Sequence, residues 1–143
     1  MTQSRSRRSS VKIVLIVLAV VVVLCCCGGG AGAYFFFDDR TKAAREATSA
    51  FLSDLESGDL AAAYERLCDD TRARYEQSSF EAAVNRRKPV SHDLHWGGWY
   101  GNDNGLETAR ITADVTYSTG PKEAHAVPLR KEAGAWKVCG NPY

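Results

Sequence analysis

The sequence lacks the residue patterns that mark the common catalytic and metal sites. It has no phosphate-binding glycine loop, no Ser-His-Asp arrangement and no cysteines at zinc-type spacing. Of its three histidines, His92 and His95 lie three apart, so a strand would place them on opposite faces, which is poor geometry for one metal ion. We therefore predict no metal site and no cofactor.

The chain beyond its first twelve residues also lacks an excess of positive charge. Those twelve residues carry a net charge of +4, from three arginines and one lysine. The remainder contains 14 basic and 17 acidic side chains, a net charge of −3. Such a domain has no electrostatic basis for binding a polyanion. We predict no nucleic-acid partner.

Charge is missing altogether from residues 13–37, which are almost entirely apolar. This run exceeds the roughly 20 residues that a helix needs to cross a bilayer. Basic residues precede it, and Asp38 and Asp39 follow it, so the positive-inside rule keeps the N-terminus in the cytoplasm. The sequence predicts a cytoplasmic tail at 1–12, a transmembrane anchor at 13–37 in the plasma membrane, and an extracytoplasmic domain at 38–143.

Cleavage of a signal peptide is the alternative to a retained anchor. Ala31-Gly32-Ala33 has the small-x-small pattern of a cleavage site, and its use would release a secreted protein. The aromatic residues 34–37 prolong the apolar segment beyond that site and favour the membrane–water interface. We therefore favour the anchor.

Only two of the five cysteines lie outside the predicted anchor. Cys25, Cys26 and Cys27 fall within it, whereas Cys68 and Cys139 belong to the outer domain. An oxidising compartment favours a disulfide between the last two. Closing a loop of about 70 residues would stabilise the fold by roughly 4 kcal/mol.

The first half of the outer domain has the periodicity of helices. Apolar residues recur every three or four positions from residue 41 to 57 and again from 60 to 68. Gly58 is expected to end the first helix, and Asp59 to cap the second. Residues 69–71 look like a break or a cap. The pair Ser78 and Glu81 resembles a capping box that starts a third helix, which ends before Pro89.

The second half alternates with the period of strands. Alternation is visible at 92–96, 110–118, 125–129 and 136–138, with turn residues between these segments. We therefore predict an α+β domain in which three helices pack on a curved four-stranded antiparallel sheet. Neighbouring residues of a strand point to opposite faces, so Cys139 is expected to point away from the face that Val138 shares with the core. A bond to Cys68 therefore requires the strand end to twist or the helix to pack at the sheet edge.

Several short segments carry a resemblance to known domains. They are Ala50-Phe51-Leu52-Ser53-Asp54-Leu55, Gly58-Asp59 with Ala61-Ala62-Ala63-Tyr64, Leu67-Cys68 with Thr71-Arg72, and Gly134-Ala135-Trp136-Lys137-Val138-Cys139. With the order of elements, they resemble the cone-shaped fold of the nuclear transport factor 2-like superfamily. The closer resemblance is to a small exported actinobacterial domain of unknown function related to the lumazine-binding-like group. It spans about residues 40–140 and implies a disulfide from the second helix to the last strand.

The resemblance also implies a pocket between helices and sheet, where enzymatic members place Asp, His or Tyr. His125 shares a face with Val127, and Tyr117 is also expected to point inward, so this pair could carry acid–base chemistry. Asp93 and Asp114 fall on the opposite faces, so the acidic partner of a dyad is missing by parity. The alternative for both residues is a role in the core.

Three aromatic residues are the other candidate site. Trp96, Trp99 and Tyr100 flank a pair of glycines, and a bend there would put both tryptophans on one surface for a ligand or partner. Core packing is the alternative. We favour a membrane-anchored, non-enzymatic binding or accessory module of the cell envelope, with a small ligand or an envelope protein as partner. The alternative is an exported enzyme that uses the cone pocket.

Overall fold

The computed structural model describes residues 41–141. The predicted tail at 1–12 and anchor at 13–37, with the alternative cleavage site near Ala33, lie outside the described residues. Within the described part of the chain, no helix is long and apolar enough to cross a membrane.

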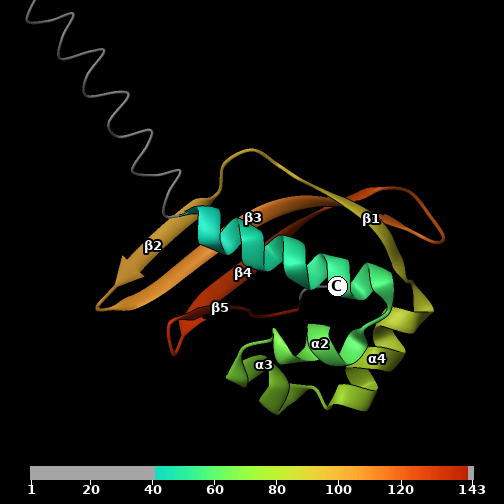
Figure 1. The fold of residues 1–143 in the computed structure, drawn as a ribbon, viewed down its shortest axis with the longest axis horizontal. Coiled ribbons are helices and arrows are strands. Elements are labelled where there is room, and N and C mark those ends of the chain that lie inside the picture. Colours follow the sequence, from blue (N-terminus) through green and yellow to red (C-terminus); the bar gives the residue numbers. More distant parts are fainter. Residues whose placement is uncertain (1–40, 142–143) are drawn as a thin grey trace, which may run out of the picture. The chain divides into compact units, whose positions relative to one another are not determined.

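The described residues form four helical segments followed by five strands (Figure 1). The segments are the helix at 41–57, α2 (Leu60–Glu65), α3 (Asp69–Arg74), α4 (Gln77–Arg86), β1 (Pro89–Leu94), β2 (Trp99–Asp103), β3 (Leu106–Tyr117), β4 (Glu123–Glu132) and β5 (Ala135–Val138).

Strand β3 is the centre of the sheet. It pairs antiparallel with β2 through residues 106–110, with β4 through 108–115, and with β1 through 113–117. Strand β5 continues the sheet beyond β4. Buried and partly exposed residues alternate along β3, so one face of the sheet covers the core. The helices pack on this face of a curled half-barrel, which makes the domain α+β, as predicted.

The core lies between the helix at 41–57 and the concave face of the sheet. Phe51 and Leu55 lie on one side of that helix and are fully buried. They belong to the same apolar cluster as Phe80 of α4, Ile111 of β3 and Leu129 of β4. Burying a side chain of this size contributes roughly 1.5–3 kcal/mol. This packing holds the helices against the sheet that carries Tyr117 and His125.

The helical boundaries confirm part of the prediction and correct the rest. Gly58 ends the first helix at φ +84°, and the Asp59 carboxylate accepts a hydrogen bond from the Ala62 N–H at 3.1 Å. The predicted break or cap at 69–71 is wrong, because these residues form the first turn of α3 and its N-cap residue is Cys68.

The predicted capping box is also wrong. Helix α4 begins one residue earlier than Ser78, at Gln77, and its N-cap residue Glu76 makes no side-chain cap bond. The Glu81 carboxylate instead accepts a hydrogen bond from the Gln77 side chain at 2.8 Å. The two side chains meet because residues four apart share a helix face.

The sheet has five strands in the described residues, whereas four were predicted. The additional strand is β2, which forms a hairpin with the first half of β3. Asn104 and Gly105 connect the two strands with φ angles of 51° and 87°, the left-handed pair that a two-residue hairpin turn requires. Glycine and polar residues interrupt the alternation of β2, so its periodicity is hard to recognise.

A disulfide joins Cys68 to Cys139, with the two Cα atoms 5.3 Å apart. The segment after α2 forms a parallel bridge with the end of β5. The Cys68 N–H donates to the Val138 carbonyl at 2.8 Å, and the Val138 N–H donates to the Arg66 carbonyl at 2.9 Å. The helix end therefore packs at the sheet edge. In this position Cys68 can bond to Cys139 although Cys139 follows the inward-pointing Val138.

Candidate functional site

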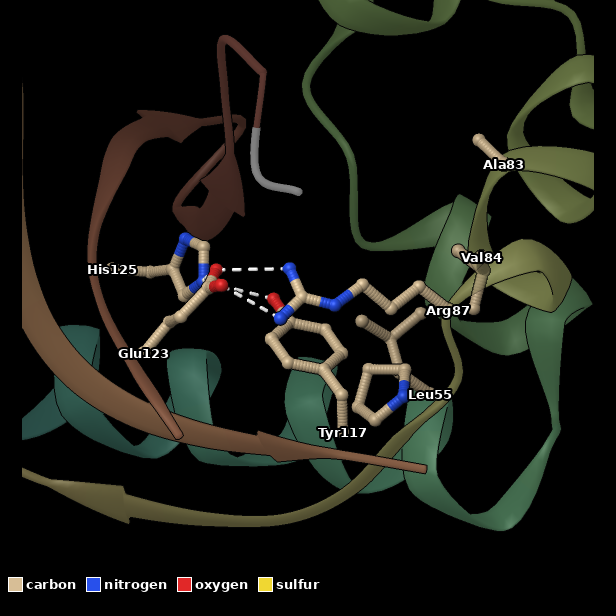
Figure 2. A pocket seen from close by; sticks show the side chains of 8 residues that line it. Leu55, Ala83, Val84, Arg87, Tyr117, Glu123 and His125 are labelled. Atoms are coloured by element: carbon tan, nitrogen blue, oxygen red, sulfur yellow. Dashed lines mark hydrogen bonds and ion pairs between the residues drawn. The ribbon is translucent and has the colours of Figure 1, made fainter. Parts of the chain in front are cut away.

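A pocket of about 200 Å³ opens between the end of the helix at 41–57, α4 and the β3–β4 hairpin (Figure 2). Its apolar part comes from the helices and the start of β1, and its polar part comes from the hairpin and the residue after α4. The lining residues are Leu55, Ala83, Val84, Pro89, Arg87, Tyr117, Glu123 and His125.

Tyr117 and His125 meet inside this pocket. Strand alternation puts both side chains on the concave face, and the Tyr117 hydroxyl lies 2.8 Å from His125 Nε2 in a hydrogen bond. The rings stand edge to face with centroids 5.8 Å apart. Burial raises the pKa of the Tyr117 phenol, so it is neutral at physiological pH. The sequence prediction that this pair points inward is confirmed.

Arg87 covers the tyrosine ring of this pair. It is the C-cap residue that follows α4, and its guanidinium binds both carboxylate oxygens of Glu123, at 3.0 and 2.6 Å. The same guanidinium lies over the Tyr117 ring, 4.0 Å from its centroid. The hydrogen bonds from Arg87 lower the pKa of the Glu123 carboxyl, and in turn they raise the pKa of Arg87. Figure 2 shows the two charged groups side by side at the pocket wall.

Glu123 also supplies the acidic group that the sequence analysis considered missing. Its Oε2 lies 3.5 Å from His125 Nε2. Asp93 and Asp114 do point elsewhere, and they bind Lys122. The prediction of a missing acidic partner is therefore wrong. Glu123 lies two residues before His125, so the strand period could have identified it.

The polar groups of the pocket bind one another. Glu123 neutralises Arg87, and the Tyr117 hydroxyl is paired with His125 Nε2. The Tyr117 oxygen retains a lone pair, since a phenolic hydroxyl both donates and accepts. The wall therefore offers a fixed hydrogen-bonding position beside an apolar floor, without net charge from the ion pair.

A second polar cluster, which the sequence analysis missed, joins the helix at 41–57 to β1. His92 Nδ1 lies 2.6 Å from a Glu56 carboxylate oxygen, and its Nε2 lies 3.0 Å from the Ser49 hydroxyl. Ser49 and Glu56 are seven residues apart on the same helix face, which is the signal that sequence could have supplied. The order resembles a nucleophile, a base and an acid. Ser49 lies mid-helix, however, where the backbone N–H groups bond within the helix, so this backbone supplies no donors for an oxyanion site.

The three residues of the predicted aromatic site differ in exposure. Trp96 and Trp99 are 72% and 60% exposed, whereas Tyr100 is partly buried with its ring edge-on to Trp136 at 6.3 Å. Tyr100 pairs with the buried Ala109 across the β2–β3 hairpin. The three residues therefore do not form one surface, and only the tryptophans stand outside. We call residues 95–99 the tryptophan loop.

Among the described residues, one group has metal-ligand atoms close together: Cys68, Cys139 and Glu132. The two sulfur atoms are bonded to each other in the disulfide and offer no thiolate. His92 and His95 point to different partners, since His95 binds Asp114 at 2.8 Å.

The sequence matches no protein-family model and no curated protein sequence. Solved structures with a similar backbone include the two that follow. A Campylobacter jejuni protein described as an NTF2-like transpeptidase has a TM-score of 0.45 and 15% identity, covering 68% of this chain and 97% of its own. A SEC-C motif containing protein from Rhodopseudomonas palustris has a TM-score of 0.45 and 14% identity, covering 73% and 88%.

Proposed function

We propose that the protein is a non-enzymatic binding module of the cell envelope, held at the plasma membrane by residues 13–37 with its N-terminus in the cytoplasm. Its ligand is a small, uncharged and largely apolar molecule with one hydroxyl or carbonyl group. The resemblance of its short motifs to an exported actinobacterial domain supports this location. The pocket supports the binding role.

The observation that carries the proposal is the pairing of the pocket's polar groups. Arg87 and Glu123 form a forked ion pair, which is the most directional arrangement available to these side chains. The pair should lower the affinity of the pocket for a charged ligand, because such a ligand would have to displace one partner of the pair. The Tyr117 hydroxyl, held by His125, is the group that a ligand can reach.

The size of the pocket limits the ligand. A volume of about 200 Å³ is smaller than the roughly 300–1,000 Å³ of pockets that hold drug-sized molecules. Leu55, Ala83, Val84 and Pro89 supply apolar contact area. A single ring with one polar substituent suits this combination.

The test compares three probes of similar size, benzyl alcohol, benzoate and benzylamine, added to the full-length protein in lipid nanodiscs. Methyl NMR signals of Leu55 and Val84 report entry into the pocket. We expect benzyl alcohol to shift these signals at lower concentration than either charged probe. Preferential binding of benzoate or benzylamine would contradict the proposed ligand class.

Two variants of α4 provide the control for binding to lipid or to other surfaces. Ala83→Leu fills the pocket, whereas Ala82→Leu makes the same change at an exposed neighbouring residue. The response to benzyl alcohol should disappear in Ala83→Leu and persist in Ala82→Leu. Equal responses in both variants would place the binding outside the pocket.

An exported acid–base enzyme is the second candidate, and the contact of His125 with Tyr117 and Glu123 favours it. A carboxylate beside a histidine that contacts a phenol can relay a proton. This function predicts a bell-shaped pH profile of turnover that Tyr117→Phe abolishes without preventing probe binding. A binding module predicts that the same variant weakens binding itself.

A further inference from the structure

The tryptophan loop exposes large apolar side chains on a backbone that is held in place. The Arg45 guanidinium donates hydrogen bonds to the carbonyls of His95 and of Gly97, the latter at 3.1 Å. Gly98 lies so close to the sheet that an added Cβ would come within 2.6 Å of Ile111 Cδ1. The backbone contacts therefore hold Trp96 and Trp99 in their exposed positions.

Trp99 has a support of its own. Its indole ring lies over Gly101, two residues along β2, where a side chain would collide with the ring. Residues two apart share a face of a strand, so this face is the one directed away from the core. Arg110, which pairs with Trp99 across the hairpin, is exposed on the same face.

The loop lies at the start of the described helix (Figure 1). An added Cβ on Gly98 would be 3.7 Å from Thr41 Cγ2, and Arg45 is one turn further along that helix. Phe37, the end of the uncharged run, precedes Thr41 by four residues. Four residues span at most about 14 Å. If residues 13–37 form the anchor, a connection of this length allows the loop to reach the bilayer surface.

We infer that Trp96 and Trp99 bind the lipid surface beside the anchor, in the headgroup region of the outer leaflet. This inference rests on the proposed membrane topology. Tryptophan favours that region because its ring is apolar and its N–H can bond to water or lipid. The exposed Arg110 and Lys42 near the loop suit anionic headgroups. Docking at this point would set the orientation of the domain, and hence of its pocket, relative to the membrane.

The three tryptophans of the chain allow a direct test, since none occurs before Trp96. The full-length protein is reconstituted into vesicles with or without phosphatidylcholine brominated near the headgroup. Three variants each retain one tryptophan and carry phenylalanine at the other two positions. We expect brominated lipid to quench Trp96 and Trp99 strongly, with emission at shorter wavelength than in detergent. Trp136, which is half-buried beside Lys131, should be quenched less.

Flotation of the vesicles after carbonate treatment separates the two ways in which the inference can fail. If the protein floats but Trp96 and Trp99 are unquenched, the loop does not touch lipid and the inference is overturned, as it would be if the loop served a partner protein. If the protein does not float, the anchor itself is wrong, and the proposed topology fails together with the inference.

Discussion

The pocket and the tryptophan loop belong to one domain but differ in whether their side chains bind one another or face the solvent. At the pocket, charged and polar groups line the wall and bind one another, as the partly exposed Arg87 does with Glu123. At the loop, Trp96 and Trp99 are left outside while backbone contacts hold them in position. An inward polar wall suits one small molecule, whereas a fixed, exposed aromatic surface suits an extended apolar partner such as a lipid bilayer.

The largest expected effect comes from breaking the disulfide that links the helices to the last strand. Replacing both Cys68 and Cys139 by alanine should lower the free energy of unfolding by roughly 4 kcal/mol, because the bond closes a loop of about 70 residues. Urea unfolding of the oxidised protein, the reduced protein and the double variant measures this. Identical midpoints for the oxidised and reduced proteins would show that the bond does not support either region.

The loop can be disturbed through Gly98. Gly98→Ala should destabilise the domain by about 1–3 kcal/mol, because the new methyl group would collide with Ile111 Cδ1. Ile111→Val removes that carbon, so the double variant should lose less stability than the two single variants together. Additive losses in urea unfolding would mean that the close approach does not hold the loop.

The pocket can be disturbed through Tyr117. Tyr117→Phe should cost about 1 kcal/mol of stability, because it removes the hydrogen bond to His125 but keeps the ring beneath Arg87. His125→Phe should cost more, since it leaves the Tyr117 hydroxyl without this partner and beside an apolar ring. Thermal unfolding of the two variants measures the difference. Equal melting temperatures for both variants and the parent would contradict a structural role for the bond.

Trp99→Ala should change the free energy of unfolding by no more than about 0.5 kcal/mol, because the side chain is 60% exposed. The same variant should weaken membrane contact at the loop. A large loss of stability in urea unfolding would instead place Trp99 in the core of the domain.

The smallest effect concerns pH. The pKa of Glu123 is lowered by Arg87, so the folded state holds its proton less tightly than the unfolded state does. This contribution to stability is present above the ordinary glutamate pKa of about 4.3 and is lost as the pH falls through the lowered value. Glu123→Gln should flatten the acid side of the stability profile. An unchanged slope would show that the pair is broken in solution.

The sequence predicted those parts of the fold in which burial on one face imposes a period. The helix at 41–57 and the alternation at 110–118 were readable for this reason, as were the inward positions of Tyr117 and His125. Strand β2 was not, because Gly101 and the polar residues after it leave no apolar period. Arg87 could not be assigned to Glu123 from sequence, since the two are 36 residues apart and meet only through tertiary packing.

The central claim is that the pocket binds a ligand through the Tyr117 hydroxyl. A titration of the full-length protein and Tyr117→Phe with benzyl alcohol and with toluene, followed by the Leu55 and Val84 methyl signals, tests it most directly. We predict that the parent protein prefers benzyl alcohol and that Tyr117→Phe loses about 1 kcal/mol of this preference, roughly a fivefold change in relative affinity. An equal preference in both proteins would show that the ligand does not reach Tyr117, and would contradict the account.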